Sequence, residues 1–152
     1  MTALLKTSTK NLFTASNILG GKAVLHTHPR SSIEWIVLVR EGIPASAIDA
    51  IIGLINIPQV ELSKALNIPE RTLIRRKKEG VLNPEESGKL HRLAQVIERA
   101  VEVFESAPLA LDWIKSPNAS LGGFTPLSLL DTDLGAQAIM DTLGRIEHGV
   151  FN

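Results

Sequence analysis

The segment from Gln59 to Gly80 constrains the fold of this 152-residue chain more than any other part of it. It reads as a short helix, a tight turn at Asn67-Ile68-Pro69 and a second short helix. Asn67 tolerates the left-handed backbone that such a turn requires, and Ile68 can fill the space between the two helices. The pattern predicts a helix-turn-helix, in which the second helix lies in the major groove of DNA.

The second helix of this motif, residues 70–79, is short and strongly cationic, with five basic and two acidic side chains. Arginine can donate two hydrogen bonds to a guanine edge, and arginine and lysine also neutralise phosphates. Helical spacing places Glu70, Leu73 and the stem of Lys77 on one side, which is expected to face the protein, and most of the cations on the other side. The DNA contacts are therefore expected from Arg71, Thr72, Arg75, Arg76 and Lys78.

Two positions depart from the commonest form of the motif. Asn67 stands where glycine is more frequent, and Arg76 stands where many such motifs keep a large apolar residue. The simpler alternative is a solvated cationic helix in an ordinary helical bundle. We favour DNA binding because the helix spacing, the turn and the one-sided cationic cluster coincide.

Apolar spacing and capping signals predict helices on both sides of this motif. Residues 32–40 are rich in β-branched side chains, but we assign them to a helix because a lone strand would have no partner. Residues 1–30 are the least readable, apart from a short helix expected at 11–19. The other predicted helices cover residues 45–56, 58–66, 70–79, 83–105, 109–115, 126–130 and 133–147, so the expected fold class is all-α.

The net charge is zero, but the charges are unevenly distributed. In contrast to the cationic helix, residues 106–152 carry two basic and five acidic side chains. Such asymmetry indicates two different partners. We therefore divide the chain into an N-terminal helical region, a helix-turn-helix region with its long connecting helix, and a C-terminal module, at residues 1–56, 57–105 and 106–152.

The N-terminal region is expected to form a homodimer. Helix-turn-helix proteins usually dimerise so that two recognition helices meet half-sites about 34 Å apart. The isoleucine-rich helix at 45–56 is expected to leave apolar surface for a second copy to cover. The absence of cysteine, of a signal-peptide pattern and of a long apolar run favours a cytoplasmic protein that makes no membrane contact.

The sequence contains little that predicts an enzyme. His26 and His28 alternate in a predicted loop, but no third metal ligand follows at a diagnostic spacing. Gly20-Gly21-Lys22 lacks the rest of a phosphate-binding loop. We expect no catalytic residue, no cofactor and no metal site; a small hydrolase or metal enzyme is the weakest alternative.

The C-terminal module contains many residues that break or cap helices. Pro117 ends a helix, Gly122-Gly123 permits positive φ, and Asp131 or Thr132 caps the last helix. Gly135 and Gly144 lie inside a helical pattern, where each costs about 1 kcal/mol relative to alanine. We expect a packing reason for both.

The pattern of this module resembles a known family. Residues 113–135 read W-x-x-x-P-N-x-x-L-G-G-x-T-P-L-x-L-L-D-T-x-x-G and the last helix ends in L-G-R-I-E-H-G, which is similar to the toxin-binding domain of the Xre/MbcA/ParS antitoxins. The motif R-R-x-x-x-G-x-L-x-x-x-E-S after the turn is also similar to the middle of such proteins. By motif position, the module is built by Trp113, Pro117, Leu121, Gly122, Gly123, Thr125, Pro126, Asp131, Thr132 and Gly135.

The resemblance implies an antitoxin whose partner is a RES-domain toxin that degrades NAD. The C-terminal region would cover the toxin's active site, and the helix-turn-helix would repress the chain's own operon. Arg145 is the strongest candidate for a toxin contact because a guanidinium can pair with a buried carboxylate; a local ion pair with Asp141 is the alternative. Toxin contacts are expected from Arg145, Ile146, Glu147, His148 and Gly149.

A second reading remains open beside this one. The chain could be a stand-alone helix-turn-helix regulator whose C-terminal module binds a ligand or mediates oligomerisation. A neighbouring toxin gene, or co-purification with a toxin, would separate the two readings.

Overall fold

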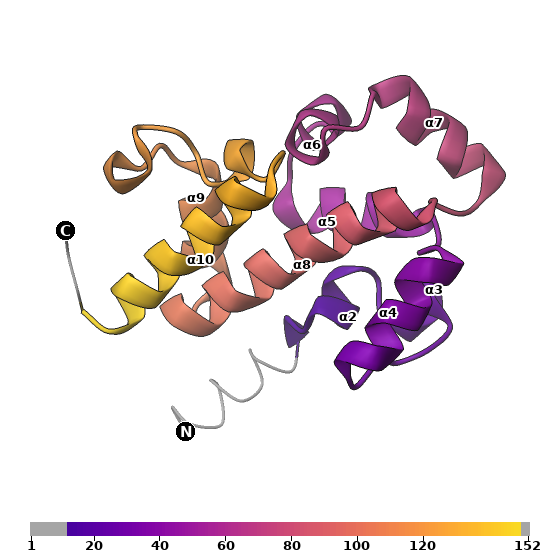
Figure 1. Ribbon diagram of the computed structural model, residues 1–152, viewed down its shortest axis with the longest axis horizontal. Coiled ribbons are helices and arrows are strands. Elements are labelled where there is room, and N and C mark those ends of the chain that lie inside the picture. Colours follow the sequence, from indigo (N-terminus) through magenta and orange to yellow (C-terminus); the bar gives the residue numbers. More distant parts are fainter. Residues whose placement is uncertain (1–11, 150–152) are drawn as a thin grey trace.

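The computed structural model describes residues 12–149, and within that range the chain is built almost entirely of helices (Figure 1). Asn11, where the first predicted helix begins, lies outside the described residues. The helices are α2 (Ala15–Ile18), α3 (Lys22–Leu25), α4 (Ser32–Glu41), α5 (Ser46–Ile55), α6 (Gln59–Leu66), α7 (Glu70–Glu79), α8 (Pro84–Phe104), α9 (Ala107–Lys115), η1 (Ala119–Leu121), η2 (Leu127–Leu129) and α10 (Asp133–Glu147).

The all-α prediction is confirmed, and each helix expected after residue 30 is present close to its predicted bounds. Residues 32–40 are helical, as assigned, with the Ser31 side chain accepting a hydrogen bond from the Glu34 N–H. The short helix α3 was not predicted, because four residues after two glycines carry no periodic pattern. An isolated bridge between Pro44 and Val81, the only strand-like pairing in the described range, joins the start of α5 to the end of α7.

The long helix α8 is the axis of the molecule. Its first turn holds a capping box, in which Asn83 and Glu86 each accept a hydrogen bond from the other's backbone N–H, and Pro84 occupies the first turn. The stripe Leu90, Leu93 and Ile97 is fully buried. Helices α2, α4 and α6 pack on α8, and so do α9 and α10 toward its other end (Figure 1).

Helix α5 corrects one expectation. Its isoleucines at 48, 51 and 55 are fully buried and Ile52 is partly buried within a single chain, so most of the apolar face expected to meet a second copy is already covered. Helices α2 and α3 cover it, and they come from the part of the sequence that was hardest to interpret. The apolar surface of the N-terminal region lies on α4 instead, where Ile33, Ile36 and Val37 are 68%, 43% and 47% exposed.

Candidate nucleic-acid interface and C-terminal module

The turn between α6 and α7 has the geometry that the sequence predicts. Asn67 adopts φ 53° and ψ 48°, the left-handed conformation that asparagine tolerates better than most residues. The Ile68 side chain is buried, and its N–H donates to the Ser63 carbonyl at 2.9 Å. Leu73 of α7 is fully buried against the rest of the domain. These contacts fix which side of α7 faces the protein and which faces outward.

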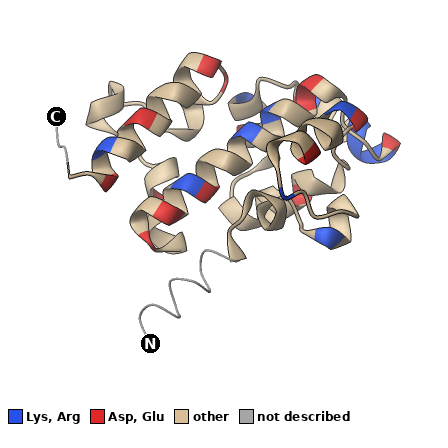
Figure 2. Cartoon of the chain, turned by 60° about the horizontal axis from the view of Figure 1, so that its bottom comes forward, with Lys and Arg blue, Asp and Glu red and all other residues tan. Residues whose placement is uncertain are grey.

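The outward side of α7 carries cations at one end of the molecule (Figure 2). Arg71, Arg75 and Lys78 are exposed, and Thr72 is half-buried beside them. Arg75 Nε lies 3.6 Å from Oε1 of Glu79, one helical turn later. Because this ion pair is exposed to solvent, it restricts the Arg75 side chain little. Four of the five residues expected to contact DNA therefore lie on or beside an accessible face.

Arg76 differs from the other predicted DNA contacts, because its guanidinium is engaged within the protein. Its Nε donates to Glu86 Oε1 at 2.8 Å and its Nη1 donates to Glu79 Oε2 at 2.9 Å. Only 19% of the side chain is exposed. Arg76 stands where many helix-turn-helix motifs keep a large apolar residue. The structure explains this difference, because an ion pair between α7 and α8 takes the place of that apolar contact.

The environment of Glu86 supports this structural role. Burial acts to raise the pKa of the Glu86 carboxyl, but the hydrogen bonds from Arg76 and from the Asn83 N–H outweigh it and hold the pKa below its ordinary value of 4.5. The same ion pair with Glu86 raises the pKa of Arg76. The carboxylate that closes the capping box of α8 therefore also anchors α7.

A second contact orients α7 from its other side. The Lys77 ammonium donates to Asp49 of α5 at 2.6 Å and also to the Gln59 side chain of α6. Lys77 was placed on the protein-facing side by helical spacing, and the structure confirms that placement. Together with Arg76, it holds the recognition helix to three other helices.

The loop that follows α9 in the C-terminal module contains glycines with the conformation predicted from sequence. Gly122 and Gly123 have φ values of 70° and 85°, which favour glycine. The loop is closed by the Asn118 N–H, which donates to the Phe124 carbonyl at 3.0 Å, and by the Gly123 N–H, which donates to the Asn118 carbonyl at 2.8 Å. Trp113 packs on Phe104 of α8 with ring centroids 5.7 Å apart.

The two glycines inside α10 have different surroundings. A Cβ at Gly135 would lie 1.7 Å from the Leu129 carbonyl oxygen, so η2 can pack against the start of α10 only if this residue is glycine. The packing reason expected for Gly135 is confirmed. The same expectation for Gly144 is wrong, because no described atom outside its own helix lies within 4 Å of a Cβ there.

Helix α10 is fastened to α8 by two arginines that lie two turns apart. Arg92 donates to the Leu130 carbonyl at 2.8 Å and to Asp133 at the start of α10. Arg99 donates to both carboxylate oxygens of Glu147 at the end of α10, each at 2.8 Å. The sequence analysis missed both arginines, since α8 reads as an amphipathic helix whose polar side could equally face solvent.

The residues expected to contact a toxin gather at the end of α10. His148 and Gly149 are exposed, Ile146 is half-buried, and Glu147 is held by Arg99. Arg145 donates to the Thr142 hydroxyl at 3.1 Å, while Asp141 accepts from Gln137 at 2.9 Å. The alternative of an ion pair between Arg145 and Asp141 is therefore wrong, and the half-buried Arg145 keeps part of its surface accessible.

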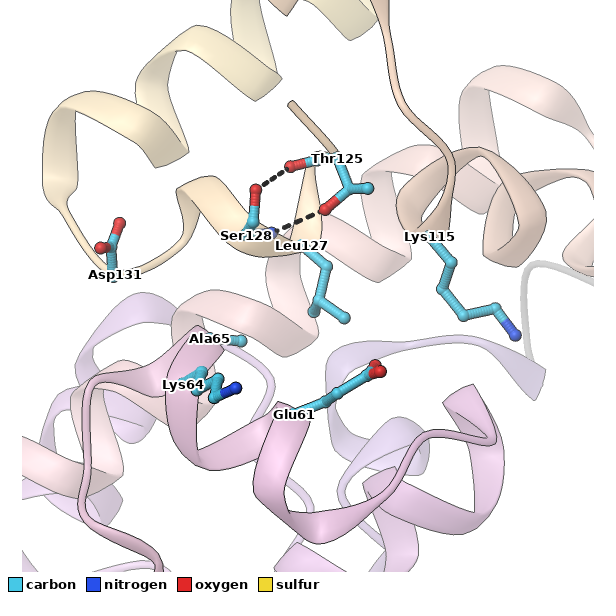
Figure 3. A pocket seen from close by; sticks show the side chains of 8 residues that line it. All are labelled: Glu61, Lys64, Ala65, Lys115, Thr125, Leu127, Ser128 and Asp131. Carbon is cyan, nitrogen blue, oxygen red and sulfur yellow. Dashed lines mark hydrogen bonds between the residues drawn. The ribbon is translucent and has the colours of Figure 1, made fainter. Parts of the chain in front are cut away.

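A cavity of about 400 Å³ lies where the helix-turn-helix meets the C-terminal module (Figure 3). Lys115 at its edge donates to the Ile55 carbonyl at 2.9 Å and so joins α9 to the end of α5. Side chains of both charges surround the opening, and Leu127 forms part of its apolar wall. The lining residues are Glu61, Lys64, Ala65, Lys115, Thr125, Leu127, Ser128 and Asp131.

The residues weighed for enzymatic roles include His26 and His28. His28 Nδ1 lies 3.4 Å from the Ser16 hydroxyl at the protein surface. Across residues 12–149, no three His, Cys, Asp or Glu side chains are arranged to hold a metal ion. None of the helices described combines the length and apolarity needed to cross a membrane.

Comparison with known proteins links these features to named domains. Residues 34–95 match the antitoxin Xre-like helix-turn-helix domain, and residues 99–149 match the C-terminal toxin-binding domain of the Xre/MbcA/ParS antitoxins. A protein named antitoxin Xre from Yersinia enterocolitica is 38% identical over 75% of this chain and 78% of its own length. A second antitoxin Xre, from Photorhabdus laumondii, is 33% identical over 76% of this chain and 79% of its own length.

A more distant relative carries a more specific name. It comes from a Sphingobium species, is called a Prs ADP-ribosylating antitoxin, and is 27% identical over 80% of this chain and 82% of its own length.

Proposed function

This chain belongs to the Xre family of antitoxins, and we propose that it neutralises a RES-domain, NAD-degrading toxin and represses its own operon. One observation carries the proposal: the exposed cations of α7 and the C-terminal module lie toward opposite ends of α8 (Figures 1 and 2). A DNA duplex and a toxin could then be bound at the same time. The proposed division at residues 1–56, 57–105 and 106–152 assigns dimerisation, DNA binding and toxin binding to successive parts.

The DNA-binding role rests on α7. We assign direct DNA contacts to Arg71, Thr72, Arg75 and Lys78, and we assign Arg76 to holding α7 against α8. Ile74, which is 45% exposed beside them, is suited to contact a thymine methyl group.

The toxin-binding role rests on the end of α10. Arg145, Ile146, His148 and Gly149 are proposed to reach the toxin, with Arg145 donating to a carboxylate of the active site. Glu147 is proposed to contact the toxin through a carboxylate whose two oxygens also accept from Arg99. The half-buried position of Arg145 on the last turn would let it contact the toxin while its bond to Thr142 orients it.

The dimer is proposed to form through α4. Its exposed Ile36 lines a groove of about 380 Å³ between α4 and α8, in which Trp35 packs on His91 with ring centroids 4.3 Å apart. Ile33 and Val37 are exposed on the same helix. An exposed apolar helix face beside such a groove is typical of protein–protein contacts.

Toxicity rescue tests the proposed function. The open reading frame next to that of this chain is expressed in bacteria with and without the chain, and growth and cellular NAD are followed. We expect growth arrest and NAD loss that this chain reverses. Protein-bound ADP-ribose is measured in parallel, because the Sphingobium relative is named for ADP-ribosylation, a reaction that also consumes NAD. A harmless neighbour, or toxicity that the chain does not reverse, would contradict the proposal.

The cavity between α6 and the C-terminal module favours a second candidate, a regulator controlled by a small ligand. Its mixture of carboxylates, ammonium groups and hydroxyls suits a small polar molecule with both charges. If the chain is such a regulator, adding cell extract as a source of the ligand should change its affinity for operator DNA, and Lys64→Gln should alter that change. The chain should then not restore growth in the toxicity test.

A further inference from the structure

We propose that the toxin contacts α10 along its whole outer face, from Leu134 to His148, and not only at its last turn. The inference rests on the proposed function and specifies the surface through which it acts. The outer face is defined by Leu134, Gln137, Asp141, Gly144 and His148.

These residues form one continuous stripe. Their spacing of three and four residues places them on the same side of a helix. The opposite side of α10, with Ala136, Ile139 and Leu143, is buried against the rest of the protein. The hydrogen bonds of Arg92 and Arg99 fasten α10 at both ends, so the outer face is presented as a rigid surface.

Leu134 has no role inside the protein that would explain a large apolar side chain. It is 85% exposed, more than any other large apolar residue on the described surface. Its backbone is nevertheless well fixed, since the Thr132 hydroxyl caps the helix by accepting from the Gly135 N–H at 2.9 Å. A rigidly held, exposed leucine at a helix start is suited to insert into an apolar pocket of a partner.

Gly144 lies almost three turns further along the same face. Glycine inside a helix is less favourable than alanine, and nothing in the described protein requires it at this position. The absence of a side chain leaves the α10 backbone open to close approach by another surface. Gly53 of α5 is equally open, and because it lies in the other half of the molecule it provides a control.

The charge of this region identifies the chemistry of the partner surface. Residues 131–149 carry four carboxylates and one arginine. Arg92 and Arg99 pair with Asp133 and Glu147, so Asp141 is the carboxylate of the outer face itself, and it is exposed. A negative charge there disfavours DNA. The occupant that fits is a protein with an apolar pocket for Leu134 and a cation for Asp141, and the match of residues 99–149 to a toxin-binding domain favours the toxin.

The test uses the full chain, tagged and co-expressed with the neighbouring toxin. Leu134→Lys and Gly144→Gln are compared with Val60→Lys, which changes an exposed apolar residue of α6, and with Gly53→Gln. Captured toxin and growth rescue are measured, and circular dichroism and operator binding report folding. We expect Leu134→Lys and Gly144→Gln each to lower capture at least tenfold, while the two control variants retain it and all four remain folded.

The outcomes distinguish an error in the proposed α10 surface from an error in the proposed function. Normal capture by folded Leu134→Lys and Gly144→Gln would overturn the proposed surface, and so would an equal loss in the control variants. If Gly144→Gln fails to fold, Asp141→Lys takes its place, and normal capture by that variant would have the same meaning. Failure of the unmodified chain to capture or neutralise the toxin would instead overturn the proposed function itself.

Discussion

Arg99 of α8 donates one hydrogen bond to each carboxylate oxygen of Glu147 in α10, both at 2.8 Å. Such a bidentate pair is stronger and more directional than a single hydrogen bond. The hydrogen bonds to Glu147 also raise the pKa of the Arg99 guanidinium above its ordinary value. The pair ties the last turn of the C-terminal module to the helix that begins next to the DNA-binding motif. It also gives Glu147 a role inside the protein besides the toxin contact expected from the sequence.

The first prediction concerns this pair. Arg99→Ala and Glu147→Ala should each lower the free energy of unfolding, and a double-mutant cycle should give a coupling of about 0.5–1 kcal/mol, because both side chains are partly solvated. Urea denaturation of the two single variants and the double variant measures it. Additive effects would show that the pair adds nothing to stability.

The second prediction contrasts the two glycines of α10. Gly135→Ala should destabilise the protein by about 3 kcal/mol or more, because its Cβ would overlap the Leu129 carbonyl oxygen. Gly144→Ala should stabilise it by about 0.5–1 kcal/mol, because the same change there meets no atom and favours the helix. Thermal unfolding of both variants is the measurement. Similar effects at the two sites would contradict the packing described for η2.

The helices were predictable because they depend on local signals. The Asn83 cap, the Asn67 turn and the apolar stripe of α8 each act within a few residues, and all three are observed. The contacts between helices were not predictable in this way. Arg76, Arg92 and Arg99 look like surface cations in the sequence, and their partners outside their own helices lie 10 to 48 residues further along the chain.

The burial of α5, which was expected to leave apolar surface for a second copy, was unpredictable for a similar reason. The isoleucines of α5 form an apolar face, but the sequence does not show whether the same chain or another copy covers it. In the structure α2 and α3 do so; α2 lies within the short helix expected at 11–19, but the pattern of α3 is too brief to assign. The exposed apolar residues of α4 follow from that arrangement and could not be identified before it.

The third prediction concerns DNA binding. The double variant Arg71→Ala, Arg75→Ala should bind the chain's own promoter more weakly. A plot of the logarithm of the DNA-binding constant against the logarithm of the salt concentration should also become less steep, by about 0.9 for each phosphate that the variant no longer neutralises. Toxin neutralisation should be unchanged, because α7 lies far from α10 along α8. Fluorescence anisotropy over a salt series measures the slope. Lys22→Ala, which removes an exposed cation on α3, is the control, and an equal effect there would count against α7.

The fourth prediction tests α4 as the dimer surface. Ile33→Asp with Val37→Asp should convert a dimer into a monomer, because two charges would be buried in an apolar contact. Light scattering after gel filtration measures the mass, and promoter affinity should fall with it while toxin rescue persists. Val60→Asp, an exposed apolar residue of α6, is the control. A dimer that survives the α4 changes would place the interface elsewhere.

The fifth prediction follows from the lowered pKa of Glu86. A carboxyl whose pKa is lower in the folded state than in the unfolded state stabilises the fold above about 4.5, and that contribution is lost as the pH falls through the folded-state value. Glu86→Gln keeps an acceptor but not the charge, so it should cost about 1 kcal/mol near neutral pH. The difference from the unmodified chain should shrink as the pH falls below about 4.5 and through the lower folded-state pKa. Urea midpoints over a series of pH values measure it, with Asp112→Asn as a control for the loss of one exposed negative charge. A difference that stays constant with pH would mean that Arg76 stabilises α7 without the charge of Glu86.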